Sequence, residues 1–175
     1  MESHVLVSCM LVVLSYALLY FDLSGYSDIA IAVGTFVGIP VPENFKSPLT
    51  AASFTQFWRK WHVTLSDWIR EHIFVVVSGK RLNKWISALI GICTMMIMSL
   101  WHEFSLLAFL DGIYMGMFLA IENIFGLTTV DRRKTHTAIV VLRCVLVAAF
   151  FGVNAMFFTM DAYQLRHALG GFLRW

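Results

Sequence analysis

Residues 85–121 read WISALIGICTMMIMSLWHEFSLLAFLDGIYMGMFLAI and decide the fold class. Residues 85–101 carry no charge, and a second apolar run at 104–121 is interrupted only by Asp111. A helix of about 20 apolar residues is long enough to cross the hydrocarbon core of a bilayer. This stretch therefore predicts two consecutive membrane-spanning helices, joined by a turn that contains Trp101-His102-Glu103.

The composition of the whole chain supports the same class. Of its 175 residues, 59% are hydrophobic and 14% are charged, and the mean hydropathy is +0.74. Soluble domains have about 25% charged residues, so this chain lacks the polar side chains to cover a water-facing surface. The same numbers exclude a disordered chain. The sequence predicts an all-α, multi-pass transmembrane helical bundle.

The rest of the chain completes one predicted membrane domain, residues 1–175. Apolar runs at about 5–21 and 138–160 are predicted as two more spans. The run at 29–39 is too short to cross a bilayer, so it is predicted as a re-entrant or short buried helix. Prolines directly after it would end that helix. Residues 161–175 predict a short amphipathic helix that ends in Trp175.

Residues 53–72 predict an amphipathic helix lying at the membrane interface. Trp58, Trp61 and His62 recur at helical spacing on one face, and Trp- and Arg-rich helices are typical of that position. Ser53-x-x-Gln56 has the spacing of a capping box, which predicts the start of the helix. The charged residues of the opposite face are Arg59, Lys60, Asp67 and Arg70.

The basic residues predict the topology. They cluster on both sides of the 85–121 hairpin, at Lys80, Arg81 and Lys84 and at Arg132-Arg133-Lys134. Cytoplasmic loops are enriched in Lys and Arg, so both clusters are expected on the cytoplasmic side, and His102 deep in the membrane or toward its outer side. The 13 basic residues form no continuous stripe, so no nucleic-acid partner is predicted.

Two histidines are candidates for chemistry. An ionisable group deep in a membrane is costly and often marks a reactive centre, and the near-neutral pKa of an imidazole suits a general base. The alternative for His102 is a satisfied polar residue of the core or interface. For His62 the alternative is packing within an aromatic stripe. Ser66, four residues after His62, is near enough on a helix to contact it.

No metal site or disulfide framework is predicted. The closest pair among His62, His72 and His102 is ten residues apart, and no carboxylate stands at ligand spacing. The three cysteines have no CxxC spacing and lie in apolar runs, so they are interpreted as packing residues: Cys9, Cys93 and Cys144.

Four segments resemble the membrane-bound O-acyltransferase family and follow its order across most of residues 20–120. The segments are YFDLSGYSDIAI (20–31), PENF (42–45), FWRKWHVTLSDWIR (57–70) and SLWH (99–102). The resemblance is nearest to the bacterial branch, which comprises alginate and other polysaccharide O-acetylases and the membrane protein of teichoic-acid D-alanylation.

The resemblance implies a helical fold around a tunnel and a bacterial inner-membrane enzyme without a bound cofactor. An acyl group, most simply acetyl, would pass from a cytoplasmic thioester donor, acyl-CoA or an acyl-carrier protein, to hydroxyls of an extracellular polysaccharide or envelope polymer. An extracytoplasmic acyltransferase would be a further partner.

By motif position His102 is the catalytic base, and His62 orients a substrate or assists proton transfer. Arg59 and Arg70 would hold an anionic donor, with contact to lipid headgroups as the alternative. The other residues assigned to substrate binding are Trp58, Trp61, Ser66, Trp101 and Glu103.

Two departures from the family leave alternatives open. Family members show Trp-His-Gly, whereas Glu103 puts a charge where glycine would permit close approach. The chain begins where the family is past its middle, so we expect the C-terminal portion of a longer acyltransferase, which could be inactive as an isolated fragment. The alternatives are D-alanyl transfer to teichoic acid and a non-catalytic membrane subunit.

Overall fold

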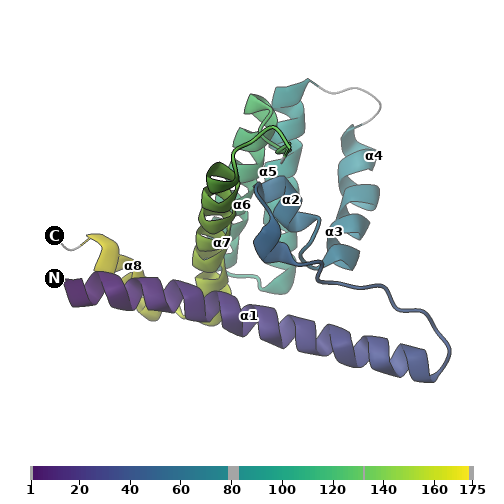
Figure 1. Ribbon diagram of the computed structural model, residues 1–175, viewed down its shortest axis with the longest axis horizontal. Helices are drawn as coiled ribbons and strands as arrows, with labels where there is room; N and C mark the ends of the chain where they lie inside the picture. Colours follow the sequence, from purple (N-terminus) through teal and green to yellow (C-terminus); the bar gives the residue numbers. More distant parts are fainter. Residues whose placement is uncertain (1, 79–82, 132, 174–175) are drawn as a thin grey trace.

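The computed structural model describes residues 2–78, 83–131 and 133–173, and all the regular secondary structure in these ranges is helical (Figure 1). The all-α prediction is confirmed. Within the described residues, four helices are long and apolar enough to cross a membrane: α1, α5, α6 and α7. The elements are α1 (Glu2–Phe36), the 3-10 turn η1 (Pro48–Thr50), α2 (Phe54–Trp58), α3 (Val63–Ile69), the π turn η2 (Arg70–Phe74), α4 (Val75–Ser78), α5 (Lys84–His102), α6 (Leu106–Phe125), α7 (Thr137–Thr159) and α8 (Ala162–Leu173).

The runs at 85–101, 104–121 and 138–160 fall on α5, α6 and α7, with ends shifted by a few residues. Local capping sets these ends. The hydroxyl of Ser105 accepts the N–H of Ala108 at 3.1 Å and starts α6. Gly126 ends α6 with a φ of 68°, a left-handed conformation that glycine adopts at little cost.

Helices α5 and α6 form an antiparallel hairpin whose backbones lie in close contact. A Cβ atom at Gly112 would lie 2.5 Å from the Cα of Met96, and one at Gly116 would lie 2.6 Å from the Cα of Ile92. These glycines have the G-x-x-x-G spacing that permits close helix packing in membranes. The hairpin therefore depends on the absence of side chains at two positions one turn apart.

Replacing Gly112 by alanine is expected to lower the free energy of unfolding by about 1–3 kcal/mol, because backbone atoms of α5 block the new methyl group. Gly91 on α5 is the matched control, since a Cβ there meets nothing within 4 Å. Gly91→Ala is expected to raise stability by up to about 1 kcal/mol through helix propensity. Thermal unfolding in detergent, followed by circular dichroism, compares the two variants. Equal changes in stability would contradict the close packing of α6 against α5 at Gly112.

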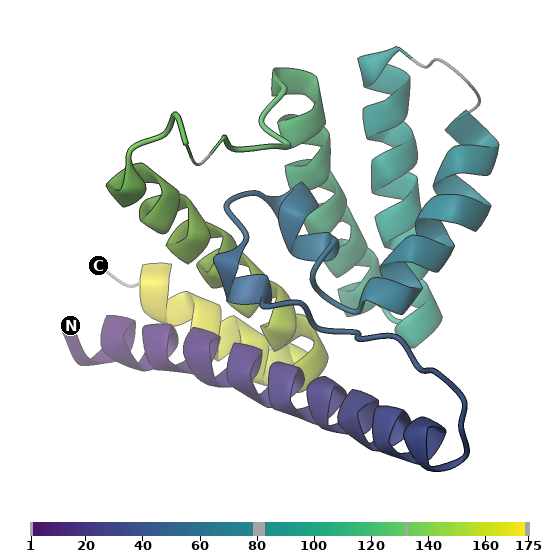
Figure 2. The same cartoon turned by 45° about the vertical axis from the view of Figure 1, so that its right-hand side comes forward.

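The N-terminal part of the chain differs from the prediction. Helix α1 runs without a break through residues 22–28 and includes much of the 29–39 run, whose residues are mostly exposed. That run is therefore not a separate buried or re-entrant helix. The predicted start of a new helix at residue 29 was wrong. One glycine and a few polar residues lower the helix propensity of residues 22–28 by too little free energy to interrupt a long helix. Helix α1 packs against α7 and α8 and crosses below the α5–α6 hairpin in Figures 1 and 2.

The predicted helix at 53–72 is also divided. Helix α2 ends at Trp58, and α3 begins after His62, whose φ of 44° and ψ of 57° are left-handed. Helix α3 then continues through η2 into α4. The predicted helix start is confirmed, because the hydroxyl of Ser53 accepts the N–H of Gln56 at 3.1 Å. The return bond of the capping box is shifted by one residue, since the side-chain oxygen of Gln56 accepts the N–H of Ala52 at 3.2 Å.

Contacts from a distant segment explain the division. The carbonyl of Asn44 accepts the N–H of Val63 at 3.0 Å, and its side-chain oxygen accepts the N–H of Thr64 at 3.0 Å. These groups would otherwise be the unpaired first donors of α3. The PENF segment thus completes the turn at His62, a tertiary effect that helical periodicity does not contain.

The aromatic face of this region is part of the protein core. Phe57 and Trp61 are 0% and 3% exposed, and both rings pack against Phe151 of α7, with centroid distances of 4.1 and 4.6 Å. The Trp61 part of the predicted membrane-interface face therefore packs inside the protein. This packing fixes the segment that carries His62 next to α7.

The start of α5 and the end of α6 lie at the same end of the molecule. The ammonium of Lys84 donates to the carbonyl of Ile124 at 3.4 Å, and His102 is the last residue of α5, at the opposite end of that helix from Lys84. The topology prediction requires both ends of the hairpin on one side of the membrane and His102 away from that side, and the hairpin has this arrangement. The assignment of that side to the cytoplasm stays a prediction. Lys80, Arg81, Arg132 and Trp175 lie outside the described residues.

Candidate active site

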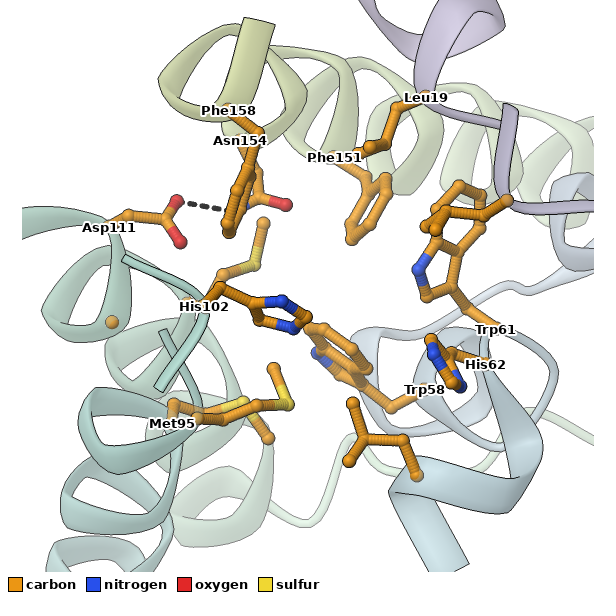
Figure 3. A pocket seen from close by; sticks show the side chains of 15 residues that line it. Leu19, Trp58, Trp61, His62, Met95, His102, Asp111, Phe151, Asn154 and Phe158 are labelled. Carbon is orange, nitrogen blue, oxygen red and sulfur yellow. Dashed lines mark hydrogen bonds between the residues drawn. The ribbon is translucent and has the colours of Figure 1, made fainter. Parts of the chain in front are cut away.

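A cavity of about 110 Å³ lies between α1, α3, α5, α6 and α7 and brings the two candidate histidines together (Figure 3). Its walls are mostly apolar, with Trp58, Trp61 and Phe151 among them. Four polar side chains line it: His62, His102, Asp111 and Asn154. The cavity therefore combines the two histidines that the sequence predicted with a carboxylic acid and an amide that it did not predict.

His102 is the last residue of α5, and the chain leaves the helix at Glu103 in an extended conformation. Its ring lies edge-to-face against Trp101, with centroids 5.0 Å apart, and against Phe158 of α7, with centroids 5.8 Å apart. Figure 3 shows the imidazole pointing into the cavity. The helix end thus presents the ring to the cavity between two aromatic neighbours.

His62 reaches the same cavity from the left-handed turn between α2 and α3. Its Nδ1 atom is buried and has no hydrogen-bond partner among the residues that the structure describes. Ser66 contacts His62 only through the backbone, where its N–H donates to the His62 carbonyl at 3.0 Å, because its hydroxyl donates to the carbonyl of Trp61 at 3.1 Å. Nδ1 is therefore a buried polar atom available to a bound molecule.

Burial lowers the pKa of His62 below its usual value, and the nearby His102 lowers it further. The unfolded chain then binds more protons than the folded protein at pH values between the lowered pKa and about 6.5. Stability is consequently lost as the pH falls below about 6.5, since the folded protein resists protonation of this ring.

We expect wild type to lose more thermal stability than His62→Asn when the pH is lowered from about 7.5 to about 5. Asparagine also tolerates the left-handed conformation, so the backbone turn is kept. Melting temperatures at the two pH values measure the difference. An equal loss in both proteins would show that His62 does not resist protonation.

A second cavity, of about 420 Å³, lies on the other side of Trp58, Met95 and Met98, which line both cavities. Besides Trp58, three further predicted substrate-binding residues line it, Arg59, Ser66 and Arg70. The guanidinium of Arg70 also pairs with Asp67 at 3.2 Å and with Glu71 at 3.3 Å. The predicted set is therefore divided between two cavities that share one wall.

The remaining two predicted residues lie outside both cavities. Trp101 is 72% exposed, and Glu103 is exposed directly after α5. They surround His102 in sequence, but neither lines the cavity into which its ring points. The structure therefore brings Trp58 and Trp61 to the histidines and leaves Trp101 and Glu103 at the helix end.

Sequence reasoning missed Asp111 and Asn154. A signal for both was present, since each is a polar residue inside a long apolar run. Neither belongs to the segments that resemble the acyltransferase family. Among the described residues, no group of three or more His, Cys, Asp or Glu side chains could hold a metal ion.

The fold and the cavity define a class of protein: an all-helical membrane protein with two histidines in one cavity. Similarity to known proteins places the chain in a family of this class. The chain belongs to the membrane-bound O-acyltransferase family, whose pattern matches residues 1–162. The prediction of this family is confirmed.

Three relatives illustrate the range of this family. The chain is 42% identical over 116 residues to the probable alginate O-acetylase AlgI of Pseudomonas fluorescens, covering 66% of this chain and 23% of the relative. It is 33% identical over 157 residues to the peptidoglycan O-acetyltransferase of Helicobacter pylori, covering 89% and 29%. It is 31% identical over 114 residues to the teichoic acid D-alanyltransferase of Bacillus subtilis, covering 61% and 29%. The matched part is thus between a fifth and a third of each relative's length.

Proposed function

We propose that this chain carries the histidine centre of a membrane O-acyltransferase that transfers an acyl group, most simply acetyl, to hydroxyls of an extracellular polysaccharide or envelope polymer. The single observation that carries the proposal is the convergence of His62 and His102 on one apolar cavity. Family membership and the names of the relatives support the reaction class.

His102 acts as the general base in this proposal. Its imidazole takes the proton from an acceptor hydroxyl while the hydroxyl oxygen attacks the thioester carbonyl. The new C–O ester bond forms, the C–S bond breaks, and the thiolate leaves and takes up the proton. His62, uncharged because burial lowers its pKa, offers Nδ1 as a hydrogen-bond partner that orients a substrate.

The second cavity is proposed to receive the acyl donor. Arg59 and Arg70 line it, and guanidinium groups bind phosphate groups well. Acyl-CoA and an acyl-carrier thioester both carry phosphate at the opposite end of the pantetheine arm from the thioester, so either fits this chemistry. Both are substrates, and no resident cofactor is proposed. For these arginines, contact with lipid headgroups stays the alternative.

The proposed setting is the inner membrane of a bacterium, with multiple passes. The donor or its carrier protein binds on the cytoplasmic side, and the acceptor polymer arrives from the opposite side, directly or through an extracytoplasmic acyltransferase. The basic residues near α5 and α6 support this orientation, because positive residues favour the cytoplasmic side.

A second candidate is D-alanyl transfer to teichoic acid. The similarity to a teichoic acid D-alanyltransferase supports it, and both reactions require a base for the acceptor hydroxyl. A non-catalytic membrane subunit is the alternative from another class, and Glu103 in place of the family's glycine favours it.

Deletion of the coding sequence in cells that make this protein tests the proposal. Mild base releases ester-linked acetate or D-alanine from the isolated polysaccharide and envelope polymers, and each is then quantified. Loss of acetate is expected, whereas loss of D-alanine would select the second candidate. If neither ester falls, the acyltransferase function is overturned.

A further inference from the structure

The mechanism above leaves a buried carboxylate unused. Asp111 of α6 is 2% exposed and lines the same cavity as His102. Removing a carboxylate from water without partners costs several kcal/mol, so a buried one is expected to be held by hydrogen bonds.

Both oxygens of Asp111 have partners on other helices. Oδ2 accepts the hydroxyl of Ser99 on α5 at 2.9 Å, and Oδ1 accepts the side-chain N–H of Asn154 on α7, as Figure 3 shows. Ser99 and Asn154 are each 2% exposed. Asp111 therefore joins three helices through a network that is almost closed to solvent.

Each partner lies one turn from an aromatic ring at the reaction centre. Ser99 precedes His102 by three residues on α5, and Asn154 precedes Phe158 by four residues on α7. The rings of His102 and Phe158 are in edge-to-face contact at an angle of 84°. The network and the ring contact thus join the same parts of α5 and α7.

We propose that Asp111 is a positioning residue, which holds the last turn of α5 against α7 so that His102 keeps its orientation in the cavity. The inference rests on the proposed function. Helix ends fray because their last carbonyl groups lack intrahelical partners, and His102 is the final residue of α5. A tether one turn earlier restricts this motion at the residue that must face the acceptor hydroxyl.

Asparagine at position 111 separates geometry from charge. Its side-chain oxygen accepts the N–H of Asn154, and its amide donates to the hydroxyl of Ser99, so both connections are kept without a carboxylate. Leucine at 111 has a similar volume and makes neither bond. Thr159→Val is the matched control, since Thr159 is a partly buried residue of α7 that lines neither cavity and whose hydroxyl donates to the carbonyl of Ala155 of the same helix at 3.0 Å.

The first measurement is the rate of polymer-ester formation in cells that carry each variant, with protein amount and melting temperature recorded. We expect Asp111→Asn and Thr159→Val to stay within about threefold of wild type. Asp111→Leu is expected to lose roughly tenfold to a hundredfold, the effect of misplacing a reacting group by about 1 Å. A loss in Asp111→Asn equal to that in Asp111→Leu overturns positioning, because charge would then be the requirement. Full activity in Asp111→Leu overturns it as well.

An exchanged pair covers the case in which Asp111→Leu does not fold. Asn154→Asp alone places two carboxylates together and is expected to lose activity. Adding Asp111→Asn restores an amide–carboxylate pair with the positions exchanged, and activity is expected to recover. Failure to recover in a folded double variant contradicts the proposal.

A second measurement is independent of catalysis. In detergent-solubilised protein with labelled histidines, the imidazole signal of His102 is assigned by its loss in His102→Ala. It is expected to be sharp in wild type and Asp111→Asn and broadened or shifted in Asn154→Leu. An unchanged signal in Asn154→Leu overturns the inference. If deletion of the gene leaves both polymer esters unchanged, the proposed function fails, while this signal still tests the tether.

Discussion

Replacing His102 by alanine is expected to reduce the rate of polymer-ester formation by about 10²–10⁴-fold, because that is the usual contribution of a general base. The ring lies at a helix end, in contact with two aromatic side chains. Its truncation therefore leaves the packing of α5 against α6 in place. Base-released ester from cells with equal amounts of each protein measures the effect.

His72→Ala is the matched control for this loss. His72 is exposed, its Nδ1 lies 2.9 Å from the carbonyl of Trp68, and it lines neither the cavity of His102 nor the second cavity. This control is expected to keep wild-type activity. His62→Ala is expected to lose activity too, since it removes the second polar ring of the cavity. Survival of polymer acylation in both His102→Ala and His62→Ala contradicts the catalytic assignment.

The second large effect is expected at Glu122, a residue remote from the histidines. Its Oε1 accepts the N–H of Phe54 at 2.6 Å, and its Oε2 accepts the N–H and hydroxyl of Thr55 at 2.8 and 2.9 Å. Glu122 is 7% exposed, so Glu122→Ala leaves buried donors at the start of α2 unpaired. Each buried unpaired donor costs about 1–3 kcal/mol, so the free energy of unfolding is expected to fall by roughly 3 kcal/mol.

Thermal unfolding in detergent measures this change, with Glu71→Ala as the control. Glu71 is an exposed partner of Arg70, and exposed ion pairs contribute about 0–1 kcal/mol. Glu122→Gln keeps the side-chain volume but only one acceptor oxygen, so an intermediate loss is expected. Equal stability of Glu122→Ala and Glu71→Ala would show that the carboxylate does not hold α2.

Periodicity and hydropathy were sufficient for the long helices. The uncharged run at 85–101 and the run at 138–160 leave few alternatives to a helix in a membrane. The same reasoning failed at residues 22–28, where a cluster of polar residues and Gly25 looks like a break although the helix continues. Gly25 has open space around it, so continuing the helix costs only backbone entropy there.

The site was predicted in part, from motif order and residue chemistry and not from hydropathy. His62 and His102 were found because motif order and residue chemistry mark them, and the structure brings both to one cavity. Arg59, Ser66 and Arg70 were predicted to share one continuous helix with His62, but that helix is divided at His62, and these three residues line a second cavity. That division depends on Asn44, whose contacts no local pattern contains.

The left-handed turn at His62 has a consequence for engineering. A non-glycine residue in this conformation costs on the order of 1 kcal/mol, so rules based on backbone propensity would select glycine at position 62. That choice would relieve the backbone and remove the imidazole from the cavity. At position 62, optimising heat tolerance and preserving turnover therefore select different amino acids. A stabilised variant of this protein has to retain histidine there, although histidine is the less favourable residue for the backbone.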